Sequence, residues 1–193
     1  VHEHYSFPNY IDGDFQTFVF HREPSHKIIH YWDEVITPSV EGVAWKPRDM
    51  LSHIADETDP EVILQDPVFN KVVNNQMSRK LGRHYDYSVL KGSEEELLSW
   101  FEVKRKEVSI IEPCTQEDFE NAKINLANCV VGTYENIVPS MERMFTMMGQ
   151  EYKNLVHQQD TLSPNNPLVG HEDLINSYNT YDYQLWEYAK TLT

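Results

Sequence analysis

The segment TFVFHREPSHKIIHYW, residues 17–32, decides the fold class of this chain. Its first four residues, 17–20, form a β-branched and aromatic run that is typical of a buried strand. Pro24 follows closely, and proline is favoured in the first turn of a helix. Apolar residues then recur at helical spacing over residues 28–36, until Pro38 ends the pattern. The segment therefore predicts a strand, a polar turn and a helix.

A second strand and helix of the same kind are predicted in the C-terminal half of the chain. The run CVVGT, residues 129–133, has the composition of a fully buried strand. One apolar stripe follows at helical spacing and ends at Gly149, a residue type that commonly terminates helices. Two such units favour an α/β fold with a parallel sheet flanked by helices. A length of 193 residues suffices for one core, so we expect a single domain over residues 1–193.

The same periodicity predicts further helices. They span residues 68–81, 94–106, 115–128 and 172–192. The predicted loops span residues 38–67 and 150–170, which are rich in Pro, Asp and Asn. Thr115 is placed as the N-cap of the third helix, which would hold its two ends roughly 20 Å apart. A disulfide needs Cα atoms within about 7 Å, so Cys114 and Cys129 are expected to be free and largely buried thiols.

The charge of the chain argues against several classes of partner. A formal net charge of -15 and a pI near 4.9 predict a surface that repels nucleic acid, anionic membranes and polyanionic glycans. We expect no membrane segment in this chain, because no apolar run is long enough to cross a bilayer. Basic residues concentrate at 22–27 and at Arg79, Lys80 and Arg83, and the second group is expected to be solvated surface.

The turn HREPS, residues 21–25, is a candidate anion-binding site. It follows the carboxyl end of a predicted strand and begins a helix, whose free N–H groups and dipole favour an anion. Arg22 adds a bidentate donor for a phosphate, and Ser25 adds a hydroxyl. The alternative is a surface ion pair of Arg22 with Glu23 or Glu34.

His2 and His4 lie on the same side of a predicted extended segment. A pair of this kind provides a general base near neutral pH or binds a metal. A catalytic zinc needs three protein ligands, and no third ligand has a diagnostic spacing, so we expect no metal. Two exposed histidines with no chemical role are the remaining alternative.

Five segments of the chain, taken in order, resemble the carbohydrate sulfotransferase family that includes the heparan sulfate and dermatan sulfate 2-O-sulfotransferases. They are HEHYSF (2–7), TFVFHREPSHKIIHYW (17–32), NNQMSRKLG (74–82), NAKINLANCVVGTYENIVPSMERMFTMMG (121–149) and LINSYNTYDYQLWEYAKTL (174–192). Each motif is modest alone, but together they cover most of the chain. The resemblance implies a P-loop-like sulfotransferase fold, of which residues 1–193 form the C-terminal major part.

The resemblance implies transfer of a sulfuryl group from 3′-phosphoadenosine 5′-phosphosulfate (PAPS) to a hydroxyl. His4 would be the general base that deprotonates the acceptor, with His2 supporting it. Arg22 would match the arginine that binds the 3′-phosphate, in agreement with the anion expected at its turn. The VVGTYENI strand and the last helix are core elements in that comparison. The residues that it places beside cofactor or acceptor are Asn74, Gln76 and Arg79.

The chain departs from the family in two ways. The family has a serine eight residues after the arginine as a second 3′-phosphate ligand, and His30 stands there, a larger side chain that still donates a hydrogen bond. The family also begins with a strand and a lysine-containing loop that hold the 5′-phosphosulfate, and this sequence starts after that point. We therefore expect a fold incomplete at its N-terminus, with a sheet completed by a missing segment or another chain.

Two functions remain open. The first is PAPS-dependent transfer to a glycan or small hydroxyl acceptor, expected to be neutral or weakly charged because of the net charge. The alternative is a catalytically inactive, sulfotransferase-like binding or structural subunit, which the missing loop and His30 favour. The resemblance also implies a location in the Golgi lumen or secretory pathway.

Overall fold

The strand and helix predicted at residues 17–32 are both present in the computed structural model, which describes residues 17–36, 51–83, 112–153 and 162–193. Strand β1 (Phe18–His21) leads through a two-residue turn into helix α1 (Pro24–Ile36). Pro24 is the first residue of α1, where its missing N–H costs no helical hydrogen bond. Ile28, Ile29 and Trp32 are buried and attach α1 to the core.

The second unit is also present. Strand β2 (Val130–Thr133) runs parallel to β1, with Phe18 opposite Val130 and His21 opposite Thr133. A short 3₁₀ turn, η3 (Tyr134–Asn136), then leads into helix α8 (Ile137–Met147). The prediction of an α/β fold with a parallel sheet is therefore confirmed, and the sheet has two strands within the described residues.

Helix α8 occupies the edge of β2 that faces away from β1. The Thr133 N–H donates to the Ser140 hydroxyl at 3.2 Å, and the Arg143 guanidinium donates to the Val131 carbonyl. Gly132 permits this approach, because a Cβ there would lie 2.7 Å from the Phe20 ring and 2.8 Å from the Ser140 Cβ. At these positions the main chain of β2 is bound to α8 and not to a third strand.

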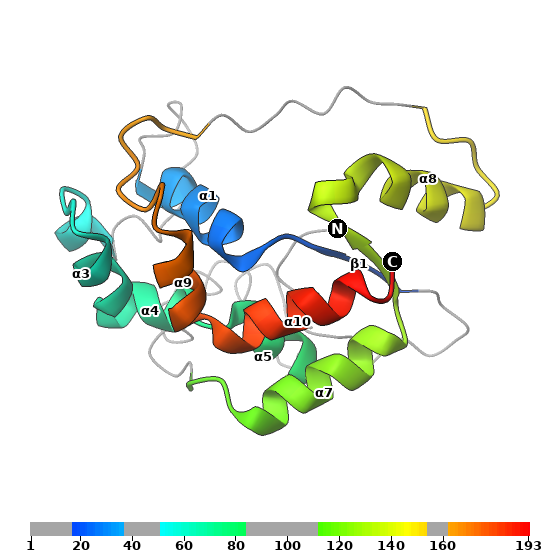
Figure 1. Ribbon diagram of the computed structural model, residues 1–193, viewed down its shortest axis with the longest axis horizontal. Coiled ribbons are helices and arrows are strands. Elements are labelled where there is room, and N and C mark those ends of the chain that lie inside the picture. The colour runs from blue at the N-terminus through cyan, green and yellow to red at the C-terminus, as the bar shows by residue number, and fades with distance from the viewer. Residues whose placement is uncertain (1–16, 37–50, 84–111, 154–161) are drawn as a thin grey trace, which may run out of the picture.

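The remaining helices pack around this unit (Figure 1). They are η1 (Ser52–Ile54), α3 (Pro60–Gln65), α4 (Pro67–Val73), α5 (Gln76–Gly82), α7 (Gln116–Ala127), α9 (Glu172–Tyr178) and α10 (Thr180–Lys190). α3, α4 and α9 gather beside α1, whereas α5, α7 and α10 lie on the side of the sheet opposite α8 (Figure 1).

Buried apolar side chains form two clusters. The first joins α1 to η1, α3, α4 and α9 through Ile28, Ile29, Trp32, Leu51, Ile54, Ile63, Leu64, Phe69, Val73, Leu168 and Ile175. The second joins β2 to α5, α7 and α10 through Leu81, Phe119, Ala122, Leu126, Val131, Leu185 and Ala189. Val19 of β1 packs against the second cluster, whereas α1 belongs to the first. The turn between β1 and α1 therefore lies where the two clusters meet.

Two helices predicted as continuous are each broken at an asparagine. The helix expected at 68–81 divides into α4 and α5, because Asn75 adopts a left-handed conformation with φ of 45°. The helix expected at 172–192 divides at Asn179 into α9 and α10. Both predictions of continuity are wrong, since apolar periodicity persists across a break that leaves the buried face in register.

The two breaks satisfy each other's main-chain groups. The Asn75 side-chain oxygen accepts from the N–H groups of Tyr181 and Asp182 at the start of α10. The Asp182 carboxylate in turn accepts from Met77 and Ser78 at the start of α5. The Asn179 side-chain oxygen accepts from the Asn75 N–H at 2.8 Å. Each helix is thus capped by the other, which offsets the cost of both interruptions.

The other sequence predictions have mixed outcomes. The helix at 115–128 is confirmed as α7, with Thr115 as N-cap in a capping box with Asp118. The loop expected at 38–67 is wrong over its last part, because α3 begins at Pro60 behind the N-cap Asp59. Both cysteines are free, as predicted, but only half-buried. The helix expected at 94–106 lies outside the described residues.

Candidate anion-binding site

The segments that follow β1 and β2 meet at the end of the sheet where both strands have their carboxyl ends. The Arg22 guanidinium carbon lies 3.6 Å from the centroid of the Tyr134 ring. The Glu23 N–H donates a 2.9 Å hydrogen bond to Oε1 of Glu135. The carboxyl ends of neighbouring parallel strands are where open α/β sheets place ligands. The carboxyl-terminal end of the sheet, at the N-terminus of α1, is therefore the candidate site.

The pairing register explains which residues meet. Because His21 lies opposite Thr133, continuing the register brings Arg22 to Tyr134 and Glu23 to Glu135. A guanidinium over an aromatic face is attracted by the ring quadrupole, and stacking leaves the N–H groups at its edge directed outward in the plane. The Tyr134 ring thus helps to fix the orientation of Arg22.

Glu135 also reaches the C-terminal helix. Its Oε2 lies 3.5 Å from the indole Nε1 of Trp186 in α10, a contact at the long limit of a hydrogen bond. Sequence reasoning treated this strand and the last helix as core without chemistry, and so missed Tyr134 and Glu135. The available signal was their position, directly after a strand expected to run parallel to β1.

Two buried side chains near the turn each carry a polar atom without a hydrogen-bond partner in the described structure. Ser25, in the first turn of α1, is 0% exposed, and its hydroxyl makes no hydrogen bond there. His21 is 1% exposed, and its Nε2 is unpartnered as well. Burial, and secondarily the charge of Lys27, lowers the pKa of His21 to about 3. The imidazole is therefore neutral at physiological pH.

The predicted cofactor ligands Arg22, Ser25 and His30 do not all face one point. Ser25 is fully buried, whereas His30 is half-buried further along α1. The two residues are five positions apart, a rotation of about 140° about the helix axis. Arg22 and Ser25 lie within the same turn, but Ser25 and His30 project from different sides of α1. The predicted catalytic residues His2 and His4 lie outside the described residues.

Arg79, predicted beside cofactor or acceptor, makes structural contacts. It is 5% exposed, and its guanidinium donates to the carbonyls of Asn74, Lys71 and Val72 at the end of α4. Asn74 donates to the Tyr178 carbonyl at 2.6 Å. The expectation of solvated surface is therefore wrong for Arg79, because α4 ends in carbonyl groups that need donors.

Arg83 is also engaged within the fold. Its guanidinium binds both carboxylate oxygens of Asp118, with Nη2 2.6 Å from Oδ2 and Nε 2.9 Å from Oδ1. It also donates to the carbonyls of Glu112 and Pro113. Solvated surface is therefore wrong for Arg83 as well, because this bidentate pair joins α5 to the start of α7.

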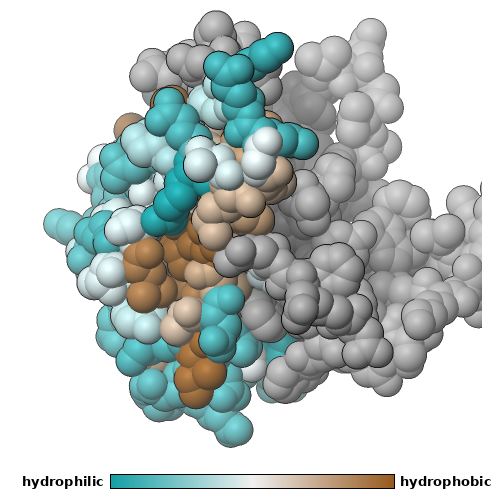
Figure 2. Space-filling view, turned by 90° about the vertical axis from the view of Figure 1, so that its right-hand side faces the viewer, coloured by the Kyte–Doolittle hydropathy of each residue, from teal (hydrophilic) through white to brown (hydrophobic). Residues whose placement is uncertain are grey.

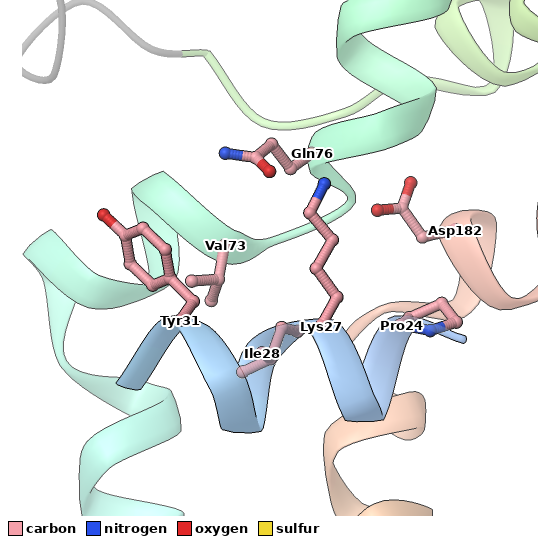
Figure 3. A pocket seen from close by; sticks show the side chains of 7 residues that line it. All are labelled: Pro24, Lys27, Ile28, Tyr31, Val73, Gln76 and Asp182. Atoms are coloured by element: carbon pink, nitrogen blue, oxygen red, sulfur yellow. The ribbon is translucent and has the colours of Figure 1, made fainter. Parts of the chain in front are cut away.

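Gln76 lines a small, open crevice beside the candidate site (Figure 3). Its walls come from α1, α4, α5 and α10, and the lining residues are Pro24, Lys27, Ile28, Tyr31, Val73, Gln76 and Asp182. The Lys27 side chain crosses the opening from α1 toward Gln76, with its Nζ 3.0 Å from the sulfur of Met77 (Figure 3). Since Pro24 begins α1, the crevice adjoins the β1–α1 turn.

The surface near α8 is partly apolar. Figure 2 shows hydrophobic residues gathered among hydrophilic ones on the side of the molecule where α8 lies. Met147 and Met148, at the end of α8, are 49% and 46% exposed. In the described part of the chain, no helix is long and apolar enough to span a membrane. No cluster of three potential metal ligands occurs among those residues either.

The chain matches no protein-family model, and no curated protein or solved structure is significantly similar to it. The sulfotransferase resemblance therefore rests on the five segments of sequence.

Proposed function

We propose that the chain is a sulfotransferase, which takes a sulfuryl group from PAPS and transfers it to a hydroxyl of a glycan or small acceptor. The observation that carries the proposal is the placement of Arg22. It lies at the carboxyl end of a parallel strand and at the start of a 13-residue helix, held against Tyr134. A cation at a helix N-terminus suits a phosphate.

The residues of the turn fit the 3′-phosphate end of the cofactor. Arg22 supplies a planar cation, and the hydroxyl of Ser25 is a buried donor without a partner in the described structure. His30 is the proposed substitute for the family's serine, on a different side of α1 from Ser25. No described residue is assigned to the 5′-phosphosulfate, whose loop the family places before the His-x-His segment.

PAPS would supply an activated sulfuryl group whose leaving group is 3′-phosphoadenosine 5′-phosphate. His4 would accept the proton of the acceptor hydroxyl as the new S–O bond forms, with His2 as its support. Arg22 would bind the cofactor and take no part in proton transfer. The net charge of -15 favours an acceptor that is neutral or weakly charged. The Golgi lumen or secretory pathway is the proposed location by resemblance.

A catalytically inactive binding or structural subunit is the second candidate, and one observation favours it. Glu135 places a carboxylate against the Glu23 N–H, inside the turn where the anion is expected. The structural contacts of Arg79 and Asn74 agree with this candidate, because they engage two of the three residues proposed beside cofactor or acceptor.

The deciding experiment is calorimetric titration with 3′-phosphoadenosine 5′-phosphate, the product nucleotide, of the unaltered chain and of Arg22→Ala. We expect binding that Arg22→Ala weakens at least tenfold, because a charge-assisted phosphate contact is lost. Lys153→Ala is the matched control, since it removes a positive charge from an exposed site. Binding that ignores Arg22, or no binding, would refute the proposed 3′-phosphate site.

The proposed roles also differ in kinetics. His4→Ala should abolish turnover and leave nucleotide affinity nearly unchanged, whereas Arg22→Ala should act chiefly on cofactor binding. Equal loss of nucleotide binding in both variants would contradict this division. Turnover should be measured with PAPS and a neutral glycan in the complete, folded protein.

A further inference from the structure

Glu135 brings a carboxylate from another element of the structure into contact with the β1–α1 turn. Its Oε1 accepts from the Glu23 N–H at 2.9 Å, and its Oε2 faces the Trp186 indole at 3.5 Å. We propose that this carboxylate is an internal occupant of the anion site, and that its negative charge limits the affinity of the site for anionic ligands. This inference rests on the proposed 3′-phosphate site.

The main chain of the turn shows why the Glu23 N–H matters. Glu23 precedes the first helical residue, and its carbonyl accepts the N–H of Lys27 at 3.0 Å. The next residue, Pro24, has no N–H to offer. The Glu23 N–H is the main-chain donor of the residue that follows Arg22, and Glu135 already uses it. An anion that approaches Arg22 meets a negative charge bound to the adjacent main-chain donor.

The position of Glu135 is determined by contacts with β1 and α10, outside its own 3₁₀ turn η3. The continued register of β1 and β2 brings it opposite Glu23, and the contact with Trp186 links it to α10. Its neighbour Tyr134 lies under the Arg22 guanidinium. The cation that would attract a phosphate and the carboxylate that would repel it are thus carried on two facing dipeptides.

The charge can be removed while the hydrogen bond is kept. Glutamine retains the accepting side-chain oxygen, so Glu135→Gln preserves the contact with the Glu23 N–H and deletes one negative charge. A unit charge about 6 Å from a phosphate, in a partly exposed site, changes the dissociation constant by about three- to tenfold. We therefore expect Glu135→Gln to bind 3′-phosphoadenosine 5′-phosphate about three- to tenfold more tightly than the unaltered chain.

The matched control is Glu142→Gln. Glu142 is exposed on α8, and its loss makes the same change in net charge without touching the turn. The affinity of this variant should stay within a factor of about two, because the charge of an exposed side chain is largely screened by water and salt. Glu135→Ala loses both the charge and the hydrogen-bond acceptor. Comparing it with Glu135→Gln separates the effect of the charge from the effect of the hydrogen bond to the Glu23 N–H.

The outcomes distinguish this inference from the proposed function. Tighter Arg22-dependent binding to Glu135→Gln, with Glu142→Gln unchanged, supports the inference. Unchanged or weaker binding to Glu135→Gln overturns it while leaving the 3′-phosphate site in place. If neither protein binds the nucleotide, titration with inorganic pyrophosphate decides the inference alone. If Glu135→Gln binds pyrophosphate more tightly than the unaltered chain, the inference about Glu135 stands and the sulfotransferase function does not. Equal binding to both proteins, or no binding, rejects the inference.

Discussion

Replacement of Gly82 by alanine should destabilise the protein through a clash with main-chain atoms of another helix. A Cβ at Gly82 would lie 2.6 Å from the carbonyl carbon of Asp118 and 2.9 Å from its Cα, with the carbonyl oxygen closer still. Ordinary carbon contacts are about 3.5–4.0 Å, so α5 and α7 would have to separate by more than about 1 Å. No side chain can yield instead, because the obstructing atoms belong to the main chain.

The expected cost follows from two opposing effects. Overpacking costs about 3 kcal/mol at the upper end of its usual range, and alanine recovers about 1 kcal/mol in a helix relative to glycine. Gly82→Ala should therefore lower the free energy of unfolding by about 2 kcal/mol. The shift also disturbs the Arg83–Asp118 pair, which joins the same two helices. Arg83→Ala should consequently cost less in the Gly82→Ala background than alone.

Urea denaturation followed by circular dichroism measures both effects. Gly149→Ala is the control for the substitution itself, because a Cβ there meets nothing within 4 Å and only the positive φ of 69° opposes it. Its cost should be about 1 kcal/mol. A cost at Gly82 no greater than at Gly149, together with an unchanged effect of Arg83→Ala, would refute the close packing of α5 on α7.

Three further predictions concern the site and the titrating groups. Tyr134→Leu should weaken nucleotide binding about two- to fivefold in calorimetry, whereas Tyr134→Phe should not, because phenylalanine keeps the ring under Arg22. The pKa of His21 falls from 6.5 to about 3 on folding, so the unfolded chain binds more protons between these values and stability falls as the pH drops below 6.5. His21→Gln should reduce that loss, by up to about 1.4 kcal/mol for each pH unit, in denaturation series at pH 7 and pH 5; an unchanged slope would contradict the burial of a neutral imidazole. Burial is the largest cause that raises the pKa of Cys114 to about 12 and that of Cys129 to about 11. Both thiols should therefore react with an alkylating reagent at pH 8 about 100-fold or more slowly than in the unfolded chain. Equal reaction rates in the folded and unfolded chain would contradict this prediction.

The parts of the fold that were predicted correctly depend on local signals. β1 is a β-branched and aromatic run, and α1 and α7 each combine an apolar pattern with a marker at their start, namely Pro24 and the N-cap Thr115. The breaks at Asn75 and Asn179 depend instead on hydrogen bonds between residues about 100 positions apart. Apolar periodicity does not reveal such hydrogen-bonded pairs, because the apolar face continues through the break.

Only the residues of the candidate site that follow β1 were predicted from the sequence, for a similar reason. Arg22 and Ser25 belong to a turn that the sequence itself marks as a helix N-terminus. Tyr134 and Glu135 join the site only because β2 pairs with β1 in one register, and a sequence does not state which strands are neighbours. Arg79 was expected in solvent because its charge is visible in the sequence, whereas the α4 carbonyls that it binds are not.

The pairing of the two strands also limits where the sheet of the proposed fold continues. Val131 and Thr133 direct main-chain groups away from β1, and both groups are bound by α8. On β1, the Thr17 carbonyl accepts from the Val130 N–H at 2.8 Å, so the alternation of a parallel ladder directs the main chain of Phe18 and Phe20 to the opposite edge. No other described strand pairs there. The proposed sulfotransferase fold would place a further parallel strand along this edge of β1. The carboxyl end of that strand would lie next to Arg22, on the side where the proposed function puts the 5′-phosphosulfate.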